Sequence, residues 1–131
     1  MADSNFVLAR GFNADAAIVK NRAVKKGTAA ESVTPVTAAG DVVLGISAFD
    51  CSAAEILKGK GASVQMMGVV EMEASVALAV GALVGISANG RAAAAGAGIR
   101  TIGVVVGNPS TNAGDVVSVL LGLPGLLGVG A

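Results

Sequence analysis

The chain has 131 residues, enough for one domain with a substantial hydrophobic core. It has 19 glycines and three phenylalanines but no tyrosine or tryptophan, so its core must consist of small branched side chains separated by frequent turns. Nine basic and nine acidic residues leave no net charge, which argues against nucleic-acid binding, and the lack of histidine removes the usual acid–base catalyst.

The N-terminal residues 1–13 are predicted to form an extended arm. An apolar hook, Phe6, Val7 and Leu8, lies inside a polar segment, and Phe12 follows it. The apolar run is too short for the hydrophobic region of a secretion signal. We expect this arm to dock on a neighbouring subunit, and the alternative is a frayed terminus.

The region 14–47 is predicted to contain three short strands. Residues 14–26 also suit a helix, but the near-alternation of branched and basic residues favours a strand at 22–25. The basic residues between Lys20 and Lys26 indicate a solvated face or, alternatively, a patch for an acidic partner. Pro35 indicates that the strand at 31–37 lies at a sheet edge, and 42–47 reads as a buried strand.

The middle of the chain combines one helical turn with one long strand. Ser52 and Glu55 have the spacing of a capping box, which predicts a helical turn ending near Leu57. Residues 62–74 then read as a strand that bends at Gly68. Glu71 and Glu73 would share one face of it, because side chains two positions apart point the same way.

The second half continues with short apolar strands. A turn and a strand are expected at 78–86, and Asn89-Gly90 is the strongest hairpin signal in the chain. Residues 92–98 suit a flexible loop, 99–106 a strand, 107–114 a long turn and 116–121 the last strand.

The C-terminal residues 122–131 have no polar side chain and are predicted to pack on their own subunit or on a partner. Glycines and Pro124 break the helix that a membrane span would need, so no membrane association is expected. The expected contact residues of this tail are Leu123, Pro124, Leu126, Leu127 and Val129.

Repeated phrases indicate an internal duplication. The pattern of 22–25 and 39–46 returns at 81–84, 89–92 and 102–106, and Ala-Gly-Asp-Val-Val occurs at both 39–43 and 113–117. Such strings predict an all-β chain, a small β-barrel or β-sandwich, with a β-domain at 14–121 between the arm and the tail. Since residues 66–131 hold only five charged side chains, we expect this half to supply contacts in an obligate assembly.

No motif for catalysis, cofactor or metal binding is found. The single Cys51 excludes an internal disulfide and reads as a buried small residue. Glu71 and Glu73 as a glycosidase pair would lack sugar-stacking aromatics, and the glycine-rich runs lack the spacing of nucleotide-binding loops. We therefore expect a protein that is not an enzyme and binds no cofactor or metal.

An ordered set of segments resembles the capsid cement, or head decoration, proteins of tailed bacteriophages. The resemblance covers most of 14–121, in the pieces at 17–25, 43–47, 64–74, 80–84, 88–92, 102–106 and 113–121. It implies a β-barrel or β-sandwich that binds the outside of an assembled capsid, usually as a homotrimer, and stabilises contacts between major capsid subunits. The arm and the tail have no counterpart in it.

The resemblance further implies synthesis in the host cytoplasm and a final place on the virion capsid surface, with the major capsid protein and copies of the chain itself as partners. A second hypothesis is a carbohydrate- or cell-surface-binding β-module displayed on a virion. The lack of tryptophan and tyrosine argues against it, because sugars stack on aromatic faces.

Overall fold

The computed structural model describes residues 5–96, 99–121 and 128–129, and these are almost entirely β-structure. Among them, no helix has the length and apolar character that crossing a bilayer requires. The elements follow the chain in the order β1 (Asn5–Ala14), β2 (Ala23–Lys26), β3 (Ser32–Pro35), β4 (Gly45–Ser47), α1 (Ala53–Leu57), β5 (Ala62–Glu73), β6 (Leu83–Ile86), β7 (Ala92–Ala94), β8 (Arg100–Thr101), β9 (Gly103–Gly107), β10 (Val116–Leu121) and β11 (Gly128–Val129).

The first barrel consists of five strands in the order β1-β3-β2-β4-β5, closed by antiparallel pairing of β1 with β5. Strand β3 pairs antiparallel with β2 and parallel with β1. The barrel encloses a core of Phe12, Ile18, Val24, Val33 and Val64, each at most 9% exposed. Its wall is therefore continuous, and no strand of this barrel is left without a neighbour on either side.

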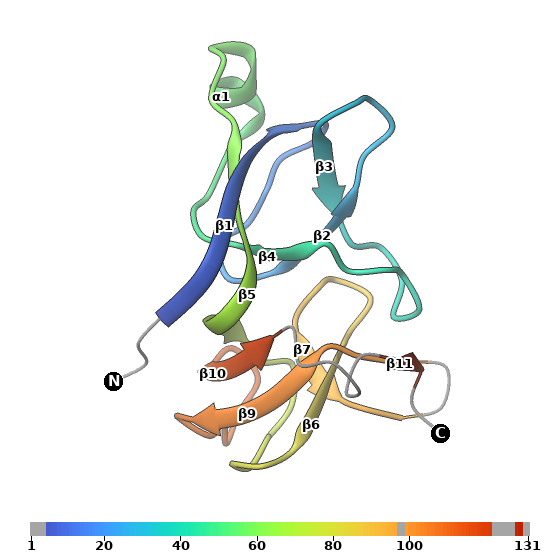
Figure 1. Cartoon of the computed structure of the whole chain (residues 1–131), viewed down its shortest axis with the longest axis vertical. Coiled ribbons are helices and arrows are strands. Elements are labelled where there is room, and N and C mark those ends of the chain that lie inside the picture. Colours follow the sequence, from blue (N-terminus) through green and yellow to red (C-terminus); the bar gives the residue numbers. More distant parts are fainter. Residues whose placement is uncertain (1–4, 97–98, 122–127, 130–131) are drawn as a thin grey trace.

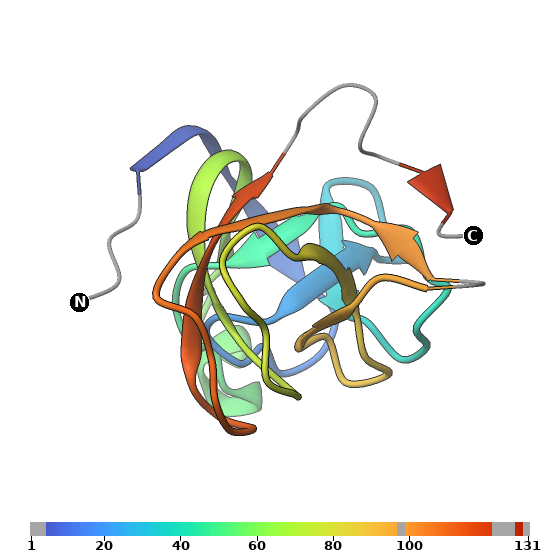
Figure 2. The same ribbon diagram turned by 90° about the horizontal axis from the view of Figure 1, so that it is seen from below.

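The second barrel has the same strand order. Strands β5, β7, β6, β9 and β10 take the places of β1, β3, β2, β4 and β5 of the first barrel. Strand β10 pairs antiparallel with β5, and a single parallel bridge between Ala74 and Ala92 closes the wall. Figure 1 shows the first barrel in the upper half and the second below it, with β5 running from one into the other. Figure 2 views the molecule from below, with the second barrel nearest the viewer.

Equivalent contacts confirm the predicted duplication inside an all-β barrel fold. Ile18 forms an isolated antiparallel bridge with Cys51 in the first barrel, and Leu78 forms one with Ser110 in the second. The main-chain N–H of Leu44 donates to Val24, and that of Ile102 donates to Val84, both at 2.8 Å. The two halves of the sequence thus fold into the same arrangement.

Strand β5 belongs to both barrels. Its first part, from Ala62, pairs with β1 and β4, and its second part, up to Glu73, pairs with β10. Gly68, between the two parts, has a left-handed backbone with φ 98°, a conformation that glycine adopts without a steric penalty. The predicted bend at Gly68 therefore marks the passage from one barrel to the next.

Three sequence expectations differ from the structure. Residues 5–13 belong to β1, a wall of the first barrel, so the boundary drawn at residue 13 coincides with no break in the fold. Residues 92–94 form β7 rather than a loop, because they pair antiparallel with β6, Ala92 opposite Ile86 and Ala94 opposite Val84. The strand at 32–35 does not lie at an edge, since β3 stands between β1 and β2, but β1 pairs only with Ser32 and Val33, which leaves Pro35 unpaired on that side.

The repeated Ala-Gly-Asp-Val-Val string forms the same turn twice. The Asp41 carboxylate accepts from the N–H groups of Thr37 and Ala38, both at 3.0 Å, and the Asp115 carboxylate accepts from those of Thr111 and Asn112, at 3.0 and 3.1 Å. The two turns lie at different places, before β4 and before β10. This string is thus a local turn signal and does not mark equivalent points of the duplication.

Candidate interaction surfaces

The described residues contain no cluster of three or more metal-ligating side chains. Cys51 is free, 1% exposed, and its Sγ lies 3.6 Å from the carbonyl oxygen of Lys60. This is the packing of a small core residue.

Glu73 is held between two arginines at the junction of the barrels. Its carboxylate lies 3.3 Å from Arg22 Nε and 2.7 Å from Arg91 Nε, and the three side chains are 19–28% exposed. Arg22 precedes β2 of the first barrel, and Arg91 precedes β7 of the second. Glu73 therefore joins the two barrels, and Glu71 lies two residues before it on the same face of β5.

The basic run 20–26 is largely engaged within the fold. Arg22 binds Glu73, Lys25 Nζ lies 3.0 Å from Asp41, and Lys26 Nζ donates to the main-chain carbonyls of Gly27 and Ala29. Only Lys20 of this run has no side-chain partner among the interactions of the described residues. The run thus supports loops of the first barrel and does not form a concentrated basic patch.

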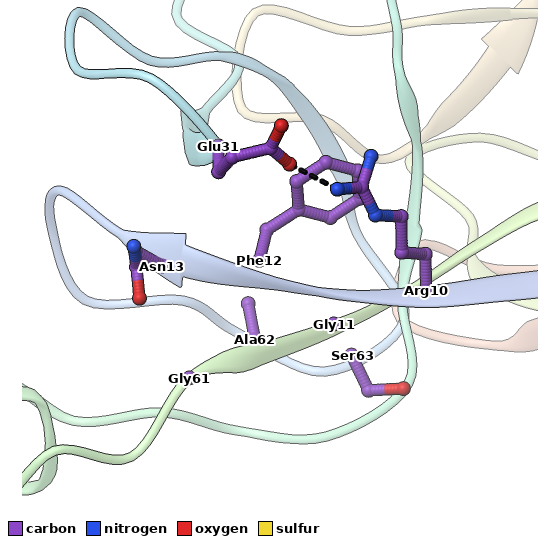
Figure 3. A pocket seen from close by; sticks show the side chains of 8 residues that line it. All are labelled: Arg10, Gly11, Phe12, Asn13, Glu31, Gly61, Ala62 and Ser63. Atoms are coloured by element: carbon purple, nitrogen blue, oxygen red, sulfur yellow. Dashed lines mark hydrogen bonds and ion pairs between the residues drawn. The ribbon is translucent and has the colours of Figure 1, made fainter.

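A shallow open depression of about 470 Å³ lies beside β1, between Arg10 and Gly61. Figure 3 shows Arg10 reaching over the Phe12 ring, 4.9 Å from its centroid, toward the carboxylate of Glu31. The two charged groups neutralise each other at the rim, and Phe12 faces the core. The depression therefore presents neither a free charge nor a free aromatic face to a ligand.

The short helix α1 forms a protrusion at the end of the first barrel (Figure 1). Ser52 and Glu55 form the predicted capping box, with Ser52 Oγ accepting from the N–H of Glu55 at 3.2 Å. The N–H of Ser52 and then Lys60 lower the pKa of Glu55 from 4.5 to about 2. Leu57, at the end of this helix, is 89% exposed.

A row of apolar side chains crosses the outer side of the second barrel. Leu83 on β6 lies opposite Val104 on β9, Val104 opposite Leu120 on β10, and Leu120 opposite Val69 on β5. We call these four residues the outer row. Their chain neighbours Val84, Val105, Val119 and Val70 are at most 1% exposed and fill the core, so the outer row points away from it.

Further apolar side chains extend the outer row. Val106 on β9 is 44% exposed, and at the β5 end Met67, 41% exposed, lies opposite Leu8, 46% exposed. Leu8 is thus one of the residues predicted from sequence to contact a partner. The outer row itself was not predicted, although the almost unbroken apolar runs at 102–106 and 116–121 indicate strands that are apolar on both faces.

The other predicted contact residues are distributed as follows. Phe6 and Val7 lie in β1, Phe12 is 9% exposed in the first core, and Val129 lies in β11, which pairs with β8. Leu123, Pro124, Leu126 and Leu127 lie outside the described residues. Phe12 therefore has little surface for a partner, and the contact roles of the remaining residues stay predictions.

Comparisons with known proteins show a similarity in fold but none in sequence. No family model and no curated protein sequence matches the chain. The fold is similar to the crystal structure of the head fiber gp8.5 N base in bacteriophage phi29, with a TM-score of 0.67 and 14% identity over 88% of this chain and 93% of that one. At this identity the similarity concerns the fold, which the two chains share over almost their full lengths.

Proposed function

We propose that this chain is a structural protein of a bacteriophage virion that decorates the outside of the head and stabilises contacts between major capsid subunits. The observation that supports it most is the shared architecture with a head fiber base, which extends over both barrels. The independent resemblance of its sequence segments to capsid decoration proteins agrees with the same location on a virion.

The surfaces described above suit a binding role. The charged residues Glu73, Arg22 and Arg91 stabilise the junction of the barrels, and Arg10 is paired with Glu31. The apolar outer row is instead available for contacts with other proteins. Attachment to a shell requires contact area rather than a reactive group, because burial of apolar surface contributes about 25 cal/mol per Å² before the cost of association.

The test is co-sedimentation of the purified chain with empty shells of the major capsid protein encoded in the same genome. We expect saturable binding and a higher melting temperature of the decorated shell, because a ligand that binds only the assembled state stabilises it. Absence of binding at saturating concentrations, with shells that are intact by electron microscopy, would contradict the proposal.

A truncation after Leu121 tests the predicted role of residues 122–131 in attachment. We expect weaker binding to the shell, and the matched control is the full chain with Leu57→Glu, a change at a distant exposed position. If the truncated chain binds with unchanged affinity, the tail does not contribute to attachment. The predicted homotrimer is measured on the same samples by light scattering.

A further inference from the structure

We propose that residues 21–23 of the first barrel form a strap that locks the second barrel shut, and that the seam under this strap is where the molecule opens first. The seam lies between β5 and β7, which among the described residues are joined by the single bridge between Ala74 and Ala92. The strap leads into β2 and bonds the loop before β7, and Figure 1 shows this loop rising toward the first barrel. A segment of one barrel thus takes part in closing the other.

The duplication shows which main-chain groups are equivalent in the two barrels. In the first barrel the N–H of Asp15 donates to the carbonyl oxygen of Val33 at 2.9 Å. In the second barrel the N–H of Ser75 donates in the same way to Ala92 at 2.8 Å. Each bond lies beside a parallel pairing of the two strands. Counting two residues back from these four gives two further equivalent pairs, Asn13 with Glu73 and Glu31 with Gly90.

The first barrel closes this position directly, because the N–H of Asn13 donates to the carbonyl oxygen of Glu31 at 2.8 Å. In the second barrel the strap takes both equivalent groups. The N–H of Glu73 donates to the carbonyl oxygen of Asn21 at 2.9 Å, and the carbonyl oxygen of Gly90 accepts from the N–H at the other end of the strap at 2.8 Å. The second barrel therefore depends on the first for its closure, whereas the first closes with its own strands.

Gly90 is the residue that lets the strap come close. Gly90 and Glu31 both have a left-handed backbone, φ 80° and 57°, so the backbone conformation alone does not require glycine at this position. A Cβ on Gly90 would lie 2.9 Å from the carbonyl oxygen of Ala23 and 3.2 Å from its nitrogen, and main-chain atoms cannot rotate away. Glycine at position 90 therefore serves the strap, and a larger residue would push the strap off the seam.

The seam is held by few apolar contacts, which is why we expect it to open first. Strand β7 consists of three alanines, from the buried Ala92 to the exposed Ala94, so its separation from β5 exposes little apolar surface. The side-chain contacts are ionic. Glu73 lies 3.3 Å from Arg22 of the strap and 2.7 Å from Arg91, and these partly exposed groups are screened by salt. In native proteins, units with few apolar contacts open before the rest.

The test is amide hydrogen exchange of the isolated full chain, followed residue by residue by NMR. Opening of the seam frees the N–H groups of Ala23 and Glu73, and Ile102, whose N–H bonds inside the second barrel at 2.8 Å, is the internal reference. Gly90→Ala puts a methyl group against the strap. Gly59→Ala is the matched control, because Gly59 has a similar left-handed backbone, φ 90°, and a Cβ there meets no atom within 4 Å.

After correction for intrinsic rates, Ala23 and Glu73 of the parent chain should exchange at least tenfold faster than Ile102. Sodium chloride at about 0.5 M should widen this ratio, because it screens the ion pairs. Gly90→Ala should widen the ratio by at least a further factor of ten, and Gly59→Ala should leave it unchanged.

Equal protection of the three amides in the parent chain, or equal effects of the two glycine variants, would overturn the proposal. If Gly90→Ala does not fold, the ratio in the parent chain decides alone. Because the isolated chain is measured, the result is independent of whether the chain binds a shell, so its failure is distinguishable from a failure of the proposed function.

Discussion

Gly45 and Gly103 occupy the same position in the two barrels, and the main chain of the next strand lies against each of them. Gly45 pairs with Val24 and Gly103 with Val84. A Cβ on Gly45 would lie 2.5 Å from the carbonyl oxygen of Gln65, and one on Gly103 would overlap that of Leu120. Both repeats therefore have glycine at the position where the main chain of the next strand, β5 or β10, leaves no room for a side chain.

We accordingly expect Gly45→Ala and Gly103→Ala each to lower the free energy of unfolding by about 3 kcal/mol, near the upper end for overpacking, because main-chain atoms cannot rotate away. Urea unfolding followed by circular dichroism measures it. Gly11→Ala is the control, since a Cβ there meets no atom within 4 Å. Equal effects at the three positions would show that close approach is not the cause.

A second pair, Asn21 and Gly81, separates backbone strain from packing. Both residues have a left-handed backbone, φ 63° and 91°, and donate their N–H groups to Ser47 and Val105 at 2.9 and 2.7 Å. A Cβ on Gly81 would meet no atom within 4 Å. Gly81→Ala should therefore cost about 1–2 kcal/mol from backbone strain alone, and Gly81→Asn clearly less, because asparagine tolerates this region. If Gly81→Ala is as stable as the parent chain, the left-handed backbone at position 81 does not strain an alanine.

Glu73→Gln should destabilise the junction of the barrels by about 2 kcal/mol, between the values for exposed and fully buried ion pairs, because two partly buried arginines lose their counter-charge. Glu71→Gln on the same strand is the matched control and should change stability by less than ~0.5 kcal/mol. Thermal and urea unfolding measure both variants. The interpretation fails if the two substitutions have the same effect.

Stability is expected to fall in acid because of the carboxylates in the turns. The N–H of Thr37 and then Lys25 lower the pKa of Asp41 from 3.8 to about 2, and the N–H groups of Thr111 and Asn112 lower the pKa of Asp115. A carboxyl group with a depressed folded-state pKa stabilises the fold above its unfolded pKa, and this contribution is lost as the pH falls through the folded pKa.

The free energy of unfolding should therefore decline between about pH 4 and pH 2, and Asp41→Asn should make this part of the profile shallower. Urea unfolding at a series of pH values, with the parent chain alongside, measures the difference. A profile of Asp41→Asn that runs parallel to that of the parent chain would contradict the assignment.

Much of the fold follows from local signals in the sequence. The capping box at Ser52, the bend at Gly68, the hairpin at Asn89-Gly90 and the strand at Val116–Leu121 all lie where the pattern predicts them, although β11 follows that strand. In each case the conformation depends on residues that are neighbours in the chain, so a short stretch of sequence specifies it.

The remaining features depend on distant parts of the chain. Residues 5–13 resemble a free arm by composition and become a barrel wall only because β5 provides a partner strand. The outer row arises from the register of four strands. Leu83 and Val69 belong to one row because Val104 and Leu120 lie between them on the two intervening strands. Strand register is set by tertiary packing, so periodicity indicates that these strands are apolar but not which side chains come together.

Because β5 forms a wall of each barrel, neither repeat can be excised as an autonomous unit. Cleaving the chain within β5 would open both cores at once, although the repeats read in the sequence as two modules. The two halves should therefore melt in one cooperative transition, and a force applied to either end of the chain is transmitted along a single continuous strand through the middle of the molecule.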